Sequence, residues 1–188
     1  MPPAAWHDAS MAPLSRLGKQ VQEVLDCLER IGVPSALIGG LALAPYKVIR
    51  ATQGIDLLTD ARRADAVDRE LQALGYSCLH RSGDAGNYVR GDERVDLLYA
   101  SRPAALRLLA DAKSRSTPFG TLRVISLEGL IAFKLQGLVN DPSRTRDLED
   151  IRALLQMNRD IVDLDAVREY FRLFDREALL DEILSTLP

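Results

Sequence analysis

Histidine and cysteine are scarce in this sequence of 188 residues, which contains two of each. Two histidines, His7 and His80, argue against a histidine-rich zinc site and against a catalytic triad built on histidine. The cysteines, Cys27 and Cys78, are too few for a disulfide framework, and neither lies in a Cys-x-x-Cys pair. We therefore expect a reducing, cytoplasmic setting, with both thiols buried as small hydrophobic side chains.

Long apolar runs and a strong net charge are also missing. No hydrophobic stretch approaches the ~18 residues of a membrane span, so we expect no membrane partner. The formal net charge is −3, from 24 basic and 27 acidic side chains, which gives no bulk attraction to nucleic acid or to an anionic membrane. Hydrophobic residues make up 47% and charged residues 27%, a composition typical of a globular protein with one sizeable core.

The first two thirds of the chain have the patterns of a mixed α/β domain. Residues 1–13 contain three prolines without periodicity and predict a tail, which lacks the basic and apolar regions of a signal peptide. Hydrophobic spacing predicts helices over residues 14–31, 41–46, 64–74 and 103–112, and strands over residues 35–38, 55–59, 76–80, 87–90, 94–99 and 121–125. Residues 14–125 are thus predicted to form a mixed sheet with flanking helices.

After Ser126 every segment has helical periodicity. A helix is predicted over residues 127–139 with Ser126 as its N-cap. The next is predicted to begin at Asp141-Pro142, with aspartate as N-cap and proline as the first helical residue, and to run to about residue 157. Two further helices follow, and residues 126–188 are predicted to form a C-terminal helical subdomain.

Two predicted strands share one pattern, an acid inside an apolar run. Ile-Asp-Leu-Leu at residues 55–58 is echoed by Val-Asp-Leu-Leu at residues 95–98. Side chains alternate along a strand, so Asp56 shares a face with Leu58, and Asp96 shares one with Leu98. A carboxylate isolated among apolar groups is costly or becomes protonated. The two acids either converge on a cation or a cleft, or each lies near a strand end and meets solvent or an arginine.

Two other features are candidates for contact with an anion. Gly39-Gly40 stands between an apolar strand and a helix, where it forms a tight turn or lets a phosphate approach the free N–H groups. Lys134 falls on the apolar stripe of its helix, with Asp147 at the edge of the next stripe. The alternatives are a structural Lys134–Asp147 ion pair and a lysine that reaches phosphate while the acid positions it. The other charges of residues 144–152 predict a solvated helix face.

Taken together, these runs resemble the nucleotidyltransferase superfamily of the DNA polymerase β type, and within it the AbiEii-like branch, which includes toxins of toxin–antitoxin systems. The resemblance is carried by Leu-Ile-Gly-Gly-Leu-Ala at residues 37–42 and by Arg-Ala-Thr-Gln-Gly-Ile-Asp-Leu-Leu at residues 50–58. It continues in Phe-Lys-Leu-Gln at residues 133–136 and in Arg-Thr-Arg-Asp-Leu-Glu-Asp-Ile at residues 144–151. It spans about residues 35–156.

The resemblance implies Mg²⁺-dependent transfer of a nucleotidyl group from a nucleoside triphosphate (NTP) to an unidentified acceptor, with RNA and protein as candidate classes. It assigns Mg²⁺ binding to Asp56 and Asp96, and catalysis to these two acids and Lys134. Arg50 and Thr52, which are otherwise plain loop residues, join the nucleotide site. The nucleotide-binding residues implied in this way are Gly39, Gly40, Arg50, Thr52, Lys134 and Asp147.

One position departs from the family pattern. Where the family has the first aspartate of its Asp-x-Asp pair, this sequence has Gly54. Water and nucleotide phosphates could complete a one-metal site, whereas a two-metal mechanism lacks its bridging acid. Three interpretations stay open: a weak one-metal enzyme, a catalytically degenerate module that binds a nucleotide or a protein partner, and an altered chain.

Overall fold

The structure is a computed structural model that describes residues 15–187, so the predicted tail over residues 1–13 lies outside the described residues. The strands are β1 (Ser35–Ile38), β2 (Gly54–Asp60), β3 (Ser77–Arg81), β4 (Ala85–Arg90), β5 (Glu93–Ala100), β6 (Lys113–Thr117) and β7 (Gly120–Val124). The α-helices are α1 (Arg16–Arg30), α2 (Ala64–Ala73), α3 (Pro103–Ala110), α4 (Leu127–Asn140), α5 (Thr145–Met157), α6 (Leu164–Leu173) and α7 (Glu177–Thr186). Two short 3₁₀ helices are η1 (Leu41–Tyr46) and η2 (Ala61–Arg63).

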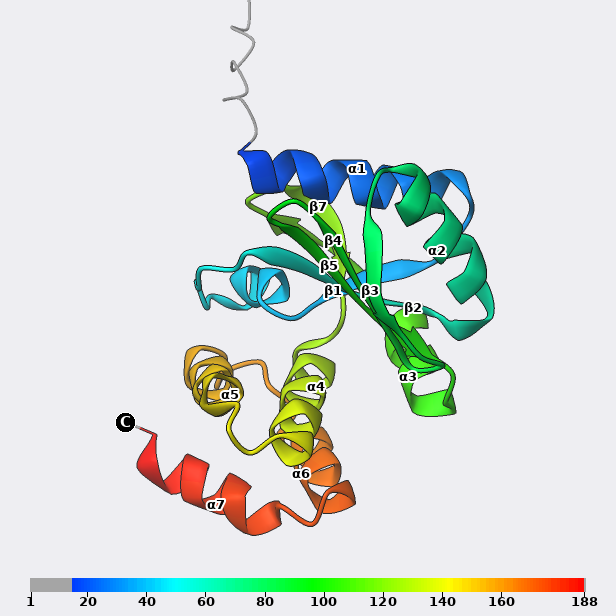
Figure 1. Cartoon of the computed structure of the whole chain (residues 1–188). Helices are drawn as coiled ribbons and strands as arrows, with labels where there is room; N and C mark the ends of the chain where they lie inside the picture. The colour runs from blue at the N-terminus through cyan, green and yellow to red at the C-terminus, as the bar shows by residue number, and fades with distance from the viewer. Residues whose placement is uncertain (1–14, 188) are drawn as a thin grey trace, which may run out of the picture.

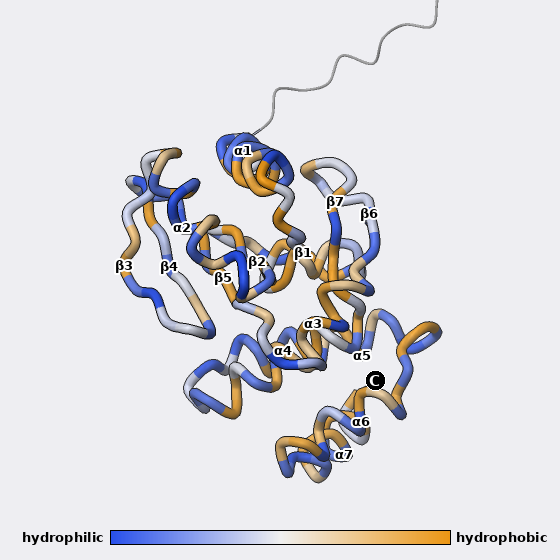
Figure 2. Tube along the Cα trace, turned by 90° about the vertical axis from the view of Figure 1, so that its right-hand side faces the viewer, coloured by the Kyte–Doolittle hydropathy of each residue, from blue (hydrophilic) through white to orange (hydrophobic). Residues whose placement is uncertain are grey.

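The strands form one mixed sheet in the order β3-β4-β5-β2-β1-β7-β6. The central strand β2 runs parallel to β5 and antiparallel to β1. In Figure 1, α1 lies above the sheet and α4 to α7 lie below it, and the turned view of Figure 2 keeps this arrangement. The predicted fold class, a mixed sheet with flanking helices followed by helices at the C-terminus, is confirmed.

The core lies on the central strands. Leu37, Leu57 and Leu97, from β1, β2 and β5, are at most 1% exposed, and the hydrophobic colour gathers along β1 and β2 in Figure 2. Helix α1 contributes Val21 and Val24, both fully buried, at helical spacing. Burial of this apolar surface fixes the register of the strands, because a shift by one residue would turn every inward side chain outward.

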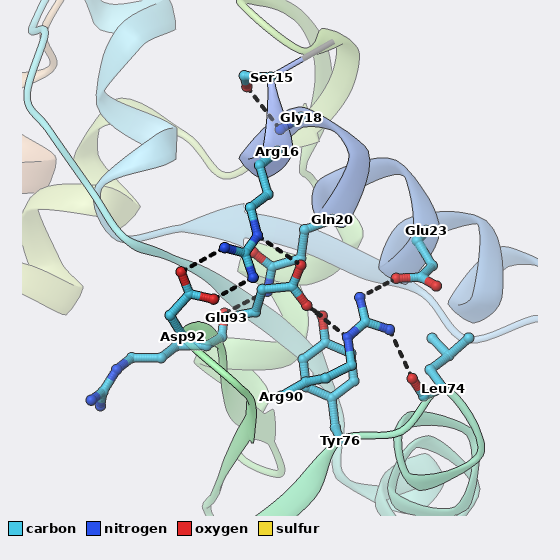
Figure 3. A network of polar contacts seen from close by, with 11 residues as sticks. Ser15, Arg16, Gly18, Gln20, Glu23, Leu74, Tyr76, Arg90, Asp92 and Glu93 are labelled. Atoms are coloured by element: carbon cyan, nitrogen blue, oxygen red, sulfur yellow. Dashed lines mark hydrogen bonds and ion pairs between the residues drawn. The ribbon is translucent and has the colours of Figure 1, made fainter.

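An arginine at the end of β4 fastens α1 and α2 to the sheet (Figure 3). Arg90 donates to the carboxylate of Glu93 at 2.6 Å, to the Leu74 carbonyl oxygen at 2.7 Å and to the carboxylate of Glu23 at 2.5 Å. Its guanidinium also lies 4.5 Å from the centre of the Tyr76 ring. The contacts join α1, the end of α2 and the β4–β5 hairpin, so the helical layer and the sheet are held in one arrangement.

The boundary between α4 and α5 differs from the prediction. Asp141 is the C-cap of α4 and not the N-cap of α5, which begins at Thr145 after Arg144. The Asp141 carboxylate accepts hydrogen bonds from the backbone N–H and the hydroxyl of Ser143, at 3.0 and 2.6 Å. These bonds form a turn. The Asp141 carboxylate therefore accepts hydrogen bonds within the turn that precedes α5, and it does not cap the first residues of that helix.

Two further expectations differ in the outer parts of the sheet. Strand β6 was not predicted, because its side chains are mostly exposed and polar and carry no apolar alternation. Cys27 is buried as expected, but Cys78 on β3 is exposed, since all residues of that edge strand are exposed. Within the described part of the chain, no helix is long and apolar enough to cross a membrane.

Truncating the core of β2 should destabilise the fold far more than the same truncation on the edge strand. Leu57 is fully buried, whereas Leu79 on β3 is 63% exposed. We expect Leu57→Ala to lower the free energy of unfolding by about 2–5 kcal/mol and Leu79→Ala by less than about 0.5 kcal/mol. Urea unfolding followed by circular dichroism measures both, and equal losses would contradict the assigned burial.

Candidate functional site

Two carboxylates lie side by side at the centre of the sheet. Asp56 on β2 and Asp96 on β5 are register partners in the parallel pairing of these strands, and neighbouring strands are about 4.8 Å apart. From β4, Asn87 donates its side-chain N–H to Asp96 Oδ1 at 2.7 Å. The sequence left open whether the two acids converge, and the register brings them together.

Burial and the neighbouring acid both change the acidity of Asp56. Burial is the main cause that raises its pKa from 3.8 to about 6, and the negative charge of Asp96 adds to the effect. Lys134, the backbone amide of Gly40 and Arg50 act in the opposite direction. A cation bound beside Asp56 would act in the same direction as these positive groups and favour the ionised carboxylate.

The glycine turn stands directly against Asp56. Because β1 runs antiparallel to β2 with Ile38 opposite Asp56, the chain after Ile38 continues past the acid. Gly39 has a φ of +66°, and a Cβ there would overlap the Asp56 carboxyl group. Only glycine fits this close approach of backbone to carboxylate.

The second glycine of the turn contacts the loop before β2. A Cβ at Gly40 would lie 3.0 Å from the Thr52 hydroxyl oxygen and 3.2 Å from an Arg50 guanidinium nitrogen. The structure therefore brings Gly39, Gly40, Arg50 and Thr52 together next to Asp56. Arg50 Nε is buried, and none of the described residues accepts a hydrogen bond from it.

Lys134 on α4 is held by two acids of α5. Its Nζ lies 3.0 Å from Asp147 Oδ1 and 2.6 Å from Asp150 Oδ2. All three residues are at most 6% exposed. Lys134 acts on Asp56 electrostatically, so the lysine is both ion-paired and close to the carboxylate pair. A buried charge needs such partners, because an unpaired one costs several kcal/mol.

Two arginines extend this network. Arg144 Nε lies 2.6 Å from Asp147 Oδ2, and Arg50 Nη1 lies 2.7 Å from Asp150 Oδ2. Three cationic groups thus share two carboxylates, which leaves one net positive charge. The Arg50–Asp150 pair also links the loop before β2 to α5, so the network connects the sheet to the C-terminal helices.

A cavity of about 400 Å³ opens between the carboxylate pair and α4. We call it the carboxylate cavity; its lining includes Asp56, Asn87, Asp96, Lys134, Arg144 and Asp147. Acids from the sheet line one part and the cationic groups of α4 and the following turn line another. A ligand that combines a metal cation with anionic groups would meet complementary charge on both sides.

The residues present fit a single Mg²⁺ ion. In the described chain there is no group of three or more His, Cys, Asp or Glu side chains that could hold a metal. Mg²⁺ is commonly bound by one or two carboxylates, with water and substrate phosphates completing an octahedron. Asp56 and Asp96 would be the two such ligands, and Gly54 stands where the motif that the sequence resembles has its first acid.

Gly54 is closely packed against the neighbouring strand. It is the register partner of Arg94, and a Cβ at Gly54 would lie 2.9 Å from Arg94 Cβ and 3.0 Å from the Arg94 carbonyl oxygen. A side chain there requires β5 to shift by a few tenths of an ångström. At the position where the acid is missing, β2 and β5 therefore pack closely against each other.

Three residues of the site were missed from the sequence: Asp150, Asn87 and Arg144, which was placed with the solvated charges of residues 144–152 and yet pairs with Asp147 and lines the carboxylate cavity. Asp150 was placed with the solvated charges of residues 144–152, yet it is 5% exposed and pairs with Lys134 and Arg50. Its spacing of three from Asp147 on one helix was the available signal. Asn87 gave no signal, because only the register of β4 against β5 brings it to Asp96.

Known structures share this fold. The solution structure of antibiotic-resistance factor ANT(2'')-Ia has a TM-score of 0.67 at 17% identity and covers 88% of this chain and 95% of its own. Lincosamide antibiotic adenylyltransferase LnuA, bound to lincomycin, has a TM-score of 0.56 at 16% identity, covering 78% of this chain and 100% of its own. A putative nucleotidyltransferase from Thermotoga maritima has a TM-score of 0.53 at 18% identity, and the match covers 70% of this chain and 91% of that protein.

No family profile and no curated protein matches the sequence. The structural similarity gives the chain a nucleotidyltransferase-like fold.

Neutralising Asp56 should stabilise the metal-free protein in a pH-dependent way. Its folded-state pKa of about 6 exceeds the ordinary value of 3.8, so native stability is lost as pH rises from 4 to 6 and stays low above 6. We expect Asp56→Asn to match the parent protein at pH 4 and to be more stable at pH 7.5, by on the order of 1–2 kcal/mol after solvent screening.

Urea unfolding in EDTA at both pH values measures this difference. Asp26→Asn is the matched control, since Asp26 is exposed on α1 and makes no side-chain hydrogen bond among the described residues. An Asp56→Asn protein that gains nothing between pH 4 and pH 7.5 would refute the raised pKa assigned to Asp56.

Proposed function

We propose that this protein transfers a nucleotidyl group from an NTP, with Mg²⁺, to a hydroxyl group of an acceptor. The observation that carries the proposal is the register pairing of Asp56 with Asp96 beside the glycine turn. The fold shared with adenylyltransferases and a putative nucleotidyltransferase supports the same chemistry. The site residues taken from the sequence resemblance are part of this proposal.

The reaction requires one bond to form and one to break. The acceptor oxygen bonds to the α-phosphorus of the NTP, the bond from that phosphorus to the bridging oxygen breaks, pyrophosphate leaves, and the hydroxyl proton is released to solvent. Mg²⁺ held by Asp56 and Asp96 would neutralise the developing charge on the phosphoryl oxygens. Asn87 holds Asp96 in place through its hydrogen bond of 2.7 Å.

The cationic network would bind the triphosphate. Lys134 keeps its orientation through Asp147 and Asp150, while the network retains one net positive charge. Arg50 has a buried Nε without an acceptor among the described residues, and it lies next to the Gly40 backbone. The Arg50 side chain is also 32% exposed, so a phosphate at the glycine turn would contact the accessible part of its guanidinium, since arginine binds phosphate oxygens with several donors at once.

The finer parts of the assignment rest on the sequence. We infer membership of the AbiEii-like branch, and a role as a toxin–antitoxin component, from the order of the motifs at residues 37–42, 50–58 and 133–151. These motifs name RNA and protein as candidate acceptor classes and do not choose an acceptor. We place the protein in the cytoplasm, where NTP and Mg²⁺ are available and both cysteines stay reduced.

A second candidate is favoured by Gly54. Because Arg94 approaches this glycine so closely, the position of the first acid is adapted to having no side chain. A module that binds a nucleotide without transferring it would keep the glycine turn and the cationic network and lose the metal-dependent step. Restoring the acid separates the two candidates.

The transferase proposal predicts metal-dependent NTP binding and label transfer. NTP with Mg²⁺ should stabilise the protein by about 2.7 kcal/mol at a hundredfold excess over the dissociation constant. With α-labelled NTPs and a cell extract, we expect Asp56→Asn and Asp96→Asn to reduce transfer by roughly 100-fold. Thermal-shift and filter-binding assays measure the two effects, with Asp26→Asn as control. Transfer that survives both substitutions would refute the role of the pair.

The role of Gly54 is tested with a matched pair of variants. Gly54→Ala adds only the Cβ that crowds Arg94, whereas Gly54→Asp adds the carboxylate as well. A one-metal enzyme predicts transfer by the parent protein that Gly54→Asp does not raise above Gly54→Ala. Transfer that appears only in Gly54→Asp would establish the degenerate module in its place.

A further inference from the structure

We propose that the acceptor is a small molecule without several charges of one sign, in which an apolar or aromatic body carries a hydroxyl group. We assign it to a second cavity of about 640 Å³, which we call the apolar cavity. Its lining includes Leu58, Leu98, Leu108, Phe133, Tyr170 and Phe174. The inference rests on the proposed transferase function and deepens it by naming the class of acceptor.

The apolar cavity adjoins the carboxylate cavity. Both are lined by five common residues, which are Ala85, Leu98, Phe133, Gln136 and Asn140. The two cavities are therefore adjacent, with these five residues at their boundary. The amides of Gln136 and Asn140 at this shared boundary offer donors and acceptors to polar groups of such a molecule.

The pairing of β2 with β5 explains why the chemistry changes from one cavity to the next. Asp56 and Asp96 are register partners, and two residues further along, on the same face, Leu58 and Leu98 are partners as well. Two residues of strand span about 6.6 Å. A hydroxyl at the carboxylate pair would thus belong to a molecule whose body lies over the two leucines.

The placement of the glycine turn and the apolar cavity along β2 also suits displacement at phosphorus. The glycine turn and Arg50 lie toward the start of β2, since β1 runs antiparallel to β2 and Ile38 is opposite Asp56. The apolar cavity lies toward the end of β2, where Leu58 is found. Attacking and leaving oxygens take opposite sides of the transferred phosphorus, and the two halves of the site lie on opposite sides of Asp56.

The charge of the lining selects against other acceptors. Its charged residues are Asp84 and Arg102, one of each sign, and both are exposed. To bind a polycation the lining would need several acidic side chains, and to bind RNA it would need several basic side chains. The volume falls within the range of pockets for drug-sized molecules, which are mostly apolar with a few placed polar groups.

The test fills the apolar cavity without touching the carboxylate pair. Ala104 on α3 lines the cavity and is exposed, so Ala104→Trp adds bulk where the core is not disturbed. Ala110→Trp is the matched control, because Ala110 is exposed at the other end of the same helix and is absent from the lining. Urea unfolding checks that both variants are folded.

Binding is measured with Nile red, a neutral apolar fluorophore, and with phenyl β-D-glucoside, which joins an aromatic ring to hydroxyl groups. We expect both to bind the parent protein and the Ala110→Trp variant, phenyl β-D-glucoside to displace Nile red, and Ala104→Trp to bind each at least tenfold more weakly. Stabilisation by NTP with Mg²⁺ should be the same in all three proteins.

Transfer is then compared among phenyl β-D-glucoside, tobramycin, total RNA and casein with α-labelled NTP and Mg²⁺. We expect the glucoside to be labelled best and Ala104→Trp to lower that labelling at least tenfold. Preferred labelling of tobramycin, RNA or casein that survives Ala104→Trp would overturn the inference. So would failure of the glucoside and Nile red to bind a protein that NTP with Mg²⁺ stabilises.

Two outcomes separate this inference from the function on which it rests. Loss of NTP binding in Ala104→Trp would assign the apolar cavity to the nucleotide base and overturn the acceptor assignment, while the transferase proposal stands. Absence of any stabilisation by NTP with Mg²⁺ in the parent protein would overturn the transferase proposal itself, whatever binds in the apolar cavity.

Discussion

The parallel pairing of β2 with β5 holds Asp56 beside Asp96, and the rest of the site is arranged around these two like charges. Burial and the repulsion between them disfavour the charged form of Asp56, whose pKa is raised to about 6. They stay together because the same register buries Leu57 and Leu97 on the opposite face, and apolar burial outweighs the electrostatic cost. The stability of the sheet is thus used to hold two carboxylates side by side.

A second constraint comes from the helices. Lys134 is buried, so it must be paired, and Asp147 and Asp150 pair with it from α5. Because Asp150 also accepts from Arg50, the position of α5 depends on the loop before β2. The cationic side of the carboxylate cavity is therefore built from the sheet layer and from the helical layer. A loss of contact between the two layers would remove charge from the site even with every strand intact.

The sequence predicted those parts of the fold and site that depend on local patterns. Apolar periodicity located the central strands and most helices, and the repeated acid-Leu-Leu pattern identified Asp56 and Asp96 as candidates. It did not predict β6, whose polar strand lies at an edge and is held by backbone pairing to β7. Nor did it predict Asp150 or Asn87 in the site, because their roles depend on the packing of α4 on α5 and on the register of β4. The prediction that Cys78 is buried was wrong because it relied on residue type, and residue type does not show that a strand lies at the edge of a sheet.

The same face of β2 and β5 carries three successive register pairs of different chemistry: Gly54 with Arg94, Asp56 with Asp96, and Leu58 with Leu98. In the proposed function the middle pair binds the metal and the third faces the acceptor. The first pair then has a particular consequence. An acid at residue 54 would place a third carboxylate beside the pair and draw in a second cation, whereas glycine leaves the backbone close to Arg94. Charge balance at this end of the site therefore depends on arginine and lysine side chains, which suits a single ion bound together with a triphosphate better than two ions bound alone.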